Sequence, residues 1–413
     1  MKNVVLFTID TLRKDVLGCY GNKDGLTPFL DSLMDQCLVF DNHMSVGPFT
    51  QASFPGILTS SYFLEFGSPQ MLSPERTIIS EVVKAGGFPT AGFHSNPYLC
   101  AYFGWKRGWD HFYDSMEDEV SDTVPYIAGN VINDKAAAWM SSQAKQADGK
   151  PFFLWAHYMD VHEPYVPAQK YIDQIDPSIK LTEEEMLALF KDVILPRDTS
   201  DPAKVELVKK LYLAHVIQVD EYAKGFFDNL KELGLLENTI VIITTDHGDE
   251  FNEHASLSHD GKMYSELINV PLIIFDPDRK ENERVETTVS GADISPTIAH
   301  LFGLSSPDNF HGQSLLPLDD YKANGVFGEA IGKLSHKVLP TDRPAHFYQE
   351  NALRITHRIE DDTWEMFDLA NDPQEKTNII DSSDDADAMK DKLRSKIDWF
   401  GKSDTPVTNV TKF

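Results

Sequence analysis

The feature that most constrains the fold is a β-favouring run at residues 239–245, which reads Thr-Ile-Val-Ile-Ile-Thr-Thr and leads directly into Asp246, His247 and Gly248. An apolar run of this length bounded by a glycine predicts a buried strand. Open α/β sheets keep their sites at the carboxyl ends of their strands, and Asp and His are common metal ligands. The run therefore predicts a site at this end of the strand. The competing interpretation is a turn-forming Asp followed by a packed His.

Strand-like apolar runs alternate with helical patterns along the first three quarters of the chain. This alternation predicts an α/β fold with a large, mainly parallel sheet flanked by helices on both faces. The expected strands are Val4–Ile9, Thr90–Phe93, Phe152–His157 and Val270–Phe275, and the expected helices are Pro28–Gln36, Thr77–Ala85, Ala203–Leu233 and Asp293–Phe302.

The pattern changes after the stretch Gly312–Pro317. Short strands at Ala352–Ile359 and Trp364–Phe367 are followed by a polar turn at 371–373 and a helix at Ala386–Phe400. These segments predict a small C-terminal antiparallel sheet with one helix. We therefore expect a catalytic domain over residues 1–320 and an α+β subdomain over residues 321–413.

Composition narrows the class of partner. The 413 residues are 41% hydrophobic and 25% charged, as in ordinary globular proteins, and the formal net charge is −28. That charge opposes binding to nucleic acid or to an anionic membrane surface. The apolar run at Val4–Phe7 is too short for a signal peptide or membrane span, which predicts a cytoplasmic protein. Cys19, Cys37 and Cys100 form no metal-like pattern and are expected to be reduced.

Asp10 follows the first predicted strand, so its carboxylate is expected at the same sheet edge as Asp246 and His247. Two carboxylates and an imidazole form part of a divalent metal shell. The alternative for Asp10 alone is a helix cap for the following turn.

The segment Gly47–Ser60 reads as a loop that passes into a short helix, with hydroxyls at Thr50 and Ser53. Such a hydroxyl is either an N-cap or a nucleophile, because helix amides stabilise anions and a metal lowers the pKa of a hydroxyl.

Together these stretches resemble the sulfatase-like branch of the alkaline phosphatase superfamily, in the family's order and over nearly the whole chain. The matching stretches are Asn3–Gly21 (NVVLFTIDTLRKDVLGCYG), Thr27–Leu33, Gly47–Ser60, His157–Pro167 (HYMDVHEPYVP), Thr245–His254 (TDHGDEFNEH), Val270–Ile274, Asp293–Leu301 and Met366–Asn378 (MFDLANDPQEKTN).

The resemblance implies a buried metal, a nucleophile that attacks the sulfur or phosphorus of an ester, and a covalent intermediate that is hydrolysed afterwards. It implies that Asp10, Asp246 and His247 are metal ligands. It also places Thr50 at the nucleophile position, beside the same ion.

The chain departs from the sulfatase pattern at several matched positions. Sulfatases carry Cys or Ser, converted to formylglycine, in a Cys/Ser-x-Pro-x-Arg signature, whereas residues 50–54 read Thr-Gln-Ala-Ser-Phe. Thr cannot give that aldehyde by the usual route, and the Arg is missing. Thr11 stands where a second acidic ligand is common. The sulfate-contacting Gly-Lys-Trp-His is replaced by His94-Ser95-Asn96-Pro97, in which Asn96 is expected to offer an amide donor to the substrate.

Four further residues are candidates through the resemblance. His162 matches a histidine that contacts the transferred group or protonates the leaving oxygen, a task suited to a pKa near neutrality; its alternative is a buried structural role. His259 and Lys262 lie where relatives place a Lys or His against the substrate anion. His254 either binds substrate or anchors the loop.

The leading hypothesis is a hydrolase of small anionic esters with one divalent ion, Thr50 as nucleophile, and phosphodiesters or phosphonates favoured. Manganese or zinc is favoured by the His ligand, with calcium and magnesium as alternatives. The rival functions are a sulfuric ester hydrolase that works without formylglycine and a catalytically silent metal- and anion-binding protein. Substrate choice is expected to lie in loops at Asp114–Gly129 and Gln169–Asp201. The oligomeric state is left open.

Overall fold

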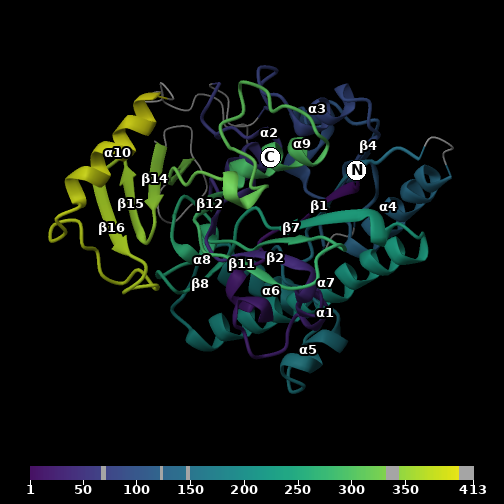
Figure 1. The fold of residues 1–413 in the computed structure, drawn as a ribbon. Coiled ribbons are helices and arrows are strands. Elements are labelled where there is room, and N and C mark those ends of the chain that lie inside the picture. Colours follow the sequence, from purple (N-terminus) through teal and green to yellow (C-terminus); the bar gives the residue numbers. More distant parts are fainter. Residues whose placement is uncertain (67–70, 121–123, 146–148, 332–343, 400–413) are drawn as a thin grey trace.

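The computed structural model describes residues 1–66, 71–120, 124–145, 149–331 and 344–399 (Figure 1). Its centre is an eight-stranded sheet in which β10 alone runs antiparallel to its neighbours, β2 and β7. The mainly parallel sheet is as predicted. In spatial order its strands are β11 (Glu283–Val285), β2 (Cys37–Phe40), β10 (Leu272–Phe275), β7 (Thr239–Thr244), β1 (Asn3–Ile9), β6 (Phe153–Tyr158), β4 (Thr90–His94) and β5 (His111–Asp114).

Both faces of this sheet are covered, which explains why its central strands are apolar throughout. On β1, Val5 and Phe7 pack in one core cluster with side chains of the helices α4 and α7, whereas Val4 and Leu6 pack on the other face with side chains of α2, α3 and α9. The helices of the main layers are α1 (Pro28–Ser32), α2 (Thr50–Thr59), α3 (Ile79–Ala85), α4 (Gly129–Ala144), α5 (Gln169–Ile175), α6 (Glu183–Leu189), α7 (Pro202–Glu232), α8 (Ser265–Ile268) and α9 (Ile294–Leu301).

A second sheet follows in the chain and lies beside the first (Figure 1). It is a four-stranded antiparallel sheet with α10 packed against it, as the sequence predicts for this part of the chain. Its elements are β13 (Val326–Ile331), β14 (Pro344–Glu350), β15 (Leu353–Arg358), β16 (Thr363–Asp368) and α10 (Ala386–Trp399). The predicted helix end at Phe400 lies outside the described residues, and the boundary at 320/321 stays a prediction.

Two predicted segments differ from the structure. The expected helix Pro28–Gln36 stops at Ser32, because the chain tightens into a 3-10 turn at Met34–Gln36 before it enters β2. The expected loop Gln169–Asp201 is wrong, since α5 and α6 lie within it. Helix α6 begins at a capping box in which the side chains of Thr182 and Glu185 accept each other's backbone N–H. A Thr followed three residues later by a Glu is a sequence pattern that predicts such a helix start.

The remaining strands form two short pairs: β3 (His43–Met44) with β12 (Val289–Ser290), and β8 (Glu250–Phe251) with β9 (Leu257–Ser258). Cys19, Cys37 and Cys100 are all unpaired. Among the described residues, no helix is both long and apolar enough to span a membrane.

Candidate active site

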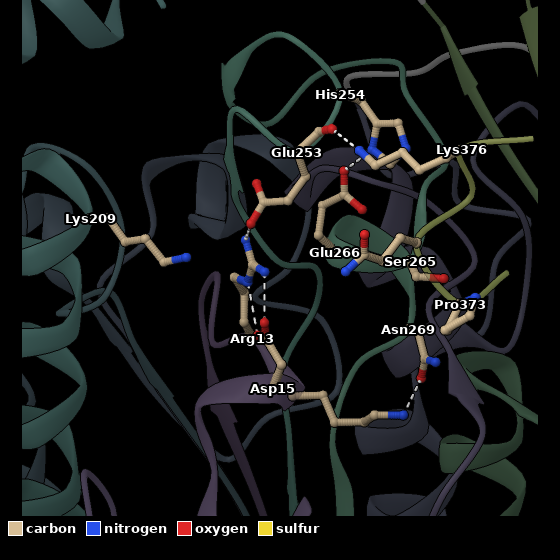
Figure 2. A pocket seen from close by; sticks show the side chains of 12 residues that line it. Arg13, Asp15, Lys209, Glu253, His254, Ser265, Glu266, Asn269, Pro373 and Lys376 are labelled. Atoms are coloured by element: carbon tan, nitrogen blue, oxygen red, sulfur yellow. Dashed lines mark hydrogen bonds and ion pairs between the residues drawn. The ribbon is translucent and has the colours of Figure 1, made fainter. Parts of the chain in front are cut away.

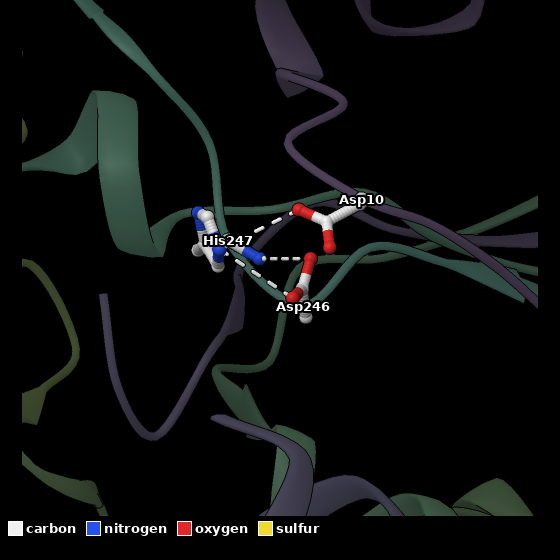
Figure 3. A group of neighbouring side chains, drawn as sticks. All are labelled: Asp10, Asp246 and His247. Atoms are coloured by element: carbon white, nitrogen blue, oxygen red, sulfur yellow. Dashed lines mark hydrogen bonds and ion pairs between the residues drawn. The ribbon is translucent and has the colours of Figure 1, made fainter. Parts of the chain in front are cut away.

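Two neighbouring parallel strands, β1 and β7, position the central side chains of the site. Asp10 follows β1, and Asp246 and His247 follow β7, so all three emerge at the carboxyl edge of the sheet. Figure 3 shows their side chains turned toward one another. One ligand atom from each lies within 4.8 Å of the others, and all three side chains are fully buried.

The donor set fits a divalent cation. His247 donates its Nδ1 hydrogen to the carbonyl of Gly248 at 2.9 Å, which fixes the tautomer and leaves Nε2 as a lone-pair ligand. Nε2 lies 3.6 Å from Asp10 Oδ1 and 3.4 Å from Asp246 Oδ2. Within the described chain these two carboxylate oxygens accept no hydrogen bond. Two buried oxygens without donors beside a free imidazole nitrogen are costly unless a cation joins them.

Asp246 also carries the turn role that the competing interpretation assigned to it. Its Oδ1 accepts the backbone N–H of His247 at 3.0 Å and that of Thr11 at 3.4 Å. The turn uses Oδ1 of Asp246, and Oδ2 faces the cluster. Asp246 can therefore form the turn and also bind a metal. Thr11 itself adopts a left-handed φ of 57°, which turns the chain sharply after Asp10.

Thr50 joins this cluster from the first residue of α2. Its Oγ1 lies 3.5 Å from both Asp10 Oδ2 and His247 Nε2. The N-cap of α2 is Phe49, which caps nothing with its side chain, so the Thr50 hydroxyl is not a cap. The Ser53 hydroxyl instead donates to the Thr50 carbonyl at 3.2 Å.

Asn96, which follows β4, lies beside Asp10 and Thr50. Its Nδ2 donates to Asp10 Oδ2 at 2.8 Å and approaches Thr50 Oγ1 at 3.4 Å. The expected amide donor therefore lies beside the cluster, and in this structure its contacts are to Asp10 and Thr50.

His157 was not among the predicted site residues, although it lies on β6 directly beside β1. Its Nε2 is 3.5 Å from Asp10 Oδ2, and its Nδ1 is 2.9 Å from the Thr8 hydroxyl. Burial opposes the charge on Asp10, but His157, His162 and His247 outweigh it and lower the pKa of Asp10. Burial and the neighbouring Asp10 raise the pKa of Asp246.

The residues at this edge of the sheet fall within a match to a known protein family. The family model described as Sulfatase matches residues 2–304, which include every residue of the cluster. This chain belongs to the sulfatase family. A second model, described as N-sulphoglucosamine sulphohydrolase, C-terminal, matches residues 253–402. The protein is thus an ester hydrolase of this family.

Individual relatives are distant but cover the chain. An arylsulfatase of Clostridium perfringens is 24% identical over 92% of this chain and 91% of its own length. A protein solved in complex with its substrate D-glucosamine-2-N,6-O-disulfate superposes with a TM-score of 0.80 at 20% identity, covering 98% of this chain and 99% of the other. The phosphonate monoester hydrolase of Agrobacterium radiobacter gives 0.76 at 18% identity, covering 97% and 96%. These structures share the fold.

Two candidate histidines, His162 and His259, lie beside the cluster. The ring of His259 lies 4.3 Å from that of His247 and 5.1 Å from that of His162, centroid to centroid. Burial and the adjacent His247 lower the pKa of His259 far below its ordinary value. For His162, burial is outweighed by nearby carboxylates, above all Asp10, and the pKa is raised. The pKa values of the two imidazoles are thus shifted in opposite directions. This suits a pair in which His162 acts as an acid and His259 is a neutral donor or acceptor.

Asp249 is the second residue that sequence reasoning missed. Its Oδ1 accepts from His259 Nδ1 at 2.8 Å, and its Oδ2 accepts the Tyr165 hydroxyl. The hydrogen bond fixes His259 as the tautomer whose Nε2 is an acceptor. The signal was present in the sequence, because Asp249 belongs to the same Asp-His-Gly-Asp stretch as the metal pair.

The hydrogen bonds of the Lys262 ammonium go to groups outside the cluster. Nζ donates to Glu250 Oε2 at 2.7 Å and to the carbonyl of His254 at 2.8 Å. His254 also lies apart: its Nδ1 is 2.6 Å from Glu266 Oε1, and its ring stacks on Tyr264 at 3.6 Å. These contacts are those of a residue that anchors the loop, which was the alternative for His254.

Proposed function

We propose that this sulfatase-family protein hydrolyses phosphodiesters or phosphonate monoesters, with Thr50 as nucleophile and one divalent ion held by Asp10, Asp246, His247 and the Thr50 oxygen. The observation that carries the proposal is the position of Thr50 Oγ1, which lies 3.5 Å from both Asp10 Oδ2 and His247 Nε2 at the start of α2. A bound divalent ion lowers the pKa of a hydroxyl and stabilises charge on a transferring phosphoryl group.

Two reactions follow from the residues present. In the first, Thr50 Oγ loses its proton to solvent and forms a bond to phosphorus, while the ester P–O bond breaks. His162, whose pKa is raised, gives its proton to the leaving oxygen. In the second, His162 takes a proton from water, the water oxygen bonds to phosphorus, and the P–Oγ bond breaks. The released Thr50 oxygen takes a proton from solvent, which regenerates the hydroxyl.

The N-terminal amides of α2 and the Asn96 amide supply hydrogen-bond donors at the point where the phosphoryl oxygens would gather. Asn96 Nδ2 is 3.4 Å from Thr50 Oγ1, and helix N-termini favour anions. The neutral His259, fixed by Asp249, can contact the substrate without adding charge. Manganese or zinc is favoured by the imidazole ligand, and calcium or magnesium by the carboxylates.

Three assays in parallel test the proposal: an aryl phosphodiester, an aryl phosphonate monoester and an aryl sulfate. We expect kcat/KM to be highest for a phosphorus ester. Rapid quenching followed by mass spectrometry should find a phosphoryl group on the Thr50 peptide. Absence of an adduct, together with full activity in Thr50→Ala, would refute the nucleophile.

The second candidate is a sulfate ester hydrolase that uses unmodified threonine. It is favoured by the match to the Clostridium perfringens arylsulfatase over nearly the full length of both chains. A kcat/KM at least about tenfold higher on the aryl sulfate would establish it in place of the first. Bound metal without turnover of any of the three esters would instead identify a silent binding protein.

A further inference from the structure

Asp249 and His259 lie at the two ends of the short hairpin formed by β8 and β9. Glu250 pairs with Ser258 in this antiparallel hairpin, so residues 249 and 259 occupy the next pair of opposite positions. The Asp249 carboxylate Oδ1 lies 2.8 Å from His259 Nδ1. The position of the His259 imidazole therefore depends on what holds the backbone at each end of the hairpin.

The Asp249 end of the hairpin is held by a guanidinium from the turn after β1. Arg13 Nη1 donates to the Asp249 carbonyl at 2.8 Å. Figure 2 shows Arg13 between Asp15 and Glu253, in the wall of a pocket, and each of these carboxylates accepts from it at 2.7 Å. The Asp249 side chain in turn accepts the Tyr165 hydroxyl. This end is thus fixed through both its backbone and its side chain.

The His259 end is held by a second guanidinium, which comes from a distant part of the chain. Arg197 Nη2 donates to the carbonyl of His259 at 2.8 Å, and its Nη1 donates to the carbonyl of Leu257. Arg197 Nε lies 4.0 Å from Asp260 Oδ2, and only 18% of the arginine side chain is exposed. One mostly buried side chain therefore contacts three residues of the loop that carries His259.

Arg197 itself stands on a well-packed segment. It follows the π-helical turn Phe190–Ile194, in which Val193 and Ile194 are buried in the same core cluster as side chains of α7. The Arg197 amide donates to the Ile194 carbonyl at 3.0 Å. Its backbone adopts a left-handed φ of 55°, which is unfavourable for a residue with a Cβ. Strain of this kind persists where the surrounding structure fixes a residue, and it is common at functional sites.

Arginine suits these contacts better than lysine would. A guanidinium is planar and presents its N–H groups in a rigid fork, so it can hold the two carbonyls of Leu257 and His259 at once. A lysine ammonium is a single point of charge on a flexible stem. Arg197 also lies within the segment 169–201, where substrate choice was expected to reside.

We propose that Arg197 is a positioning residue, which holds the His259 imidazole against Asp249 and beside the metal cluster. The inference rests on the proposed contact of His259 with the substrate. Within the described chain, the hydrogen bonds of the guanidinium go to the loop around His259 and not to the Asp10 cluster. Its effect on turnover should therefore pass through His259, and a misplacement of about 1 Å can cost about 10²-fold in rate.

A double-mutant cycle with His259 tests the inference on whichever of the three esters is turned over fastest. Arg197→Gln should lower kcat about 10- to 100-fold and change KM less than about threefold, and Arg197→Lys should recover part of the loss. In a His259→Ala background, Arg197→Gln should change kcat by less than about twofold, because residues that act as a unit are not additive.

Arg107→Gln is the matched control, since Arg107 donates to the backbone carbonyl of Arg76 at 2.7 Å, outside the hairpin. Its kcat should stay within about twofold of the parent. Urea unfolding of both arginine variants measures the change in stability that either substitution causes.

A crystal structure of Arg197→Gln gives a readout that needs no turnover. It should show His259 Nδ1 moved out of hydrogen-bond distance of Asp249 Oδ1, with Asp246 and His247 in their parental positions. In a crystal of Arg107→Gln, the bond between His259 and Asp249 should be retained.

An equal loss of kcat in the parental and His259→Ala backgrounds would overturn the inference, because Arg197 would then act on something other than His259. An unmoved imidazole in the Arg197→Gln crystal would overturn it as well, whether or not an ester is turned over. Full activity of His259→Ala would refute the role of His259 and the inference with it. The adduct at Thr50 is measured separately, so the proposed nucleophile can stand when this inference fails.

Discussion

The Thr50 hydroxyl lies 3.5 Å from Nε2 of His247, although the two residues are 197 positions apart in the chain. Helix α2 and strand β7 meet at the carboxyl edge of the sheet, and this meeting places a hydroxyl against a free imidazole nitrogen. The nucleophile proposed for the reaction is thereby part of the same cluster as the proposed metal ligands.

Thr50→Ser should retain turnover within about tenfold, because serine keeps the hydroxyl, whereas Thr50→Ala should lose on the order of 10³-fold or more in kcat. Steady-state kinetics on the preferred ester measures both. The control is Ser53→Ala on the same helix, which should stay within about tenfold of the parent. Equal activity of the alanine and serine variants at position 50 would contradict the assignment.

Chelation should remove one divalent ion per chain and abolish turnover, since the buried Asp10 Oδ1 and Asp246 Oδ2 accept no hydrogen bond within the described chain. Elemental analysis by mass spectrometry measures the ion, and re-addition of manganese or zinc should restore activity. Asp246→Asn should purify with far less metal, and the surface variant Asp118→Asn with as much as the parent. Full turnover by a metal-free preparation would count against a metal-dependent site.

Asp249→Asn should lower kcat about 10²-fold with little change in KM, because the carboxylate fixes the tautomer of His259 through a 2.8 Å hydrogen bond. Tyr165→Phe removes only the outer bond to Asp249 and should cost less. Kinetics on the preferred ester and circular dichroism of each variant separate positioning from misfolding. The idea fails if Asp249→Asn is fully active while His259→Ala is not.

Asp160 should make the protein less stable as the pH rises. Burial raises its pKa to about 7 from 3.8, although Oδ2 accepts the Gly129 amide at 2.8 Å. Between these values the folded chain keeps a proton that the unfolded chain releases, so the free energy of unfolding falls across that window.

In Asp160→Asn this part of the pH dependence should disappear, a difference of a few kcal/mol at about 1.4 kcal/mol per pKa unit. Urea unfolding at pH 5 and pH 8 measures it. Asp134→Asn, an exposed carboxylate on the neighbouring helix α4, is the control and should keep the parental pH dependence. Parallel curves for the parent and Asp160→Asn would disprove the assignment.

The ion pair between Arg354 and Glu375 should matter far more than a surface pair. Both side chains are buried, and Glu375 also accepts the Ser265 amide at 2.7 Å, which joins the C-terminal sheet to the segment after Lys262. Glu375→Gln should cost about 3–5 kcal/mol, since it leaves a buried guanidinium unpaired. Glu350→Gln, which breaks the exposed pair with Lys392, should cost under about 1 kcal/mol. Urea denaturation compares them, and similar losses would contradict this account.

Much of the site was predictable because local patterns place residues at strand ends. The runs before Asp10 and Asp246 identify parallel strands, and parallel strands bring their carboxyl ends to one edge. The capping box at Thr182 is also a local sequence pattern, yet the segment around it was predicted as a loop. Asp249 and His157 were passed over, although each lies in a stretch that the family resemblance included.

The sequence by itself determined the sheet and the edge at which Asp10, Asp246 and His247 emerge, because strand and helix patterns are local, and the family resemblance added Thr50 to this set as a prediction. Only the tertiary structure decided which polar groups touch. It tied the Lys262 ammonium to Glu250 and the His254 carbonyl, set Asp249 behind His259, and brought the Arg197 guanidinium to the His259 carbonyl. These contacts join segments that are far apart in the chain, and whether a hydrogen bond forms depends on differences in distance of a few tenths of an ångström, which no local pattern specifies.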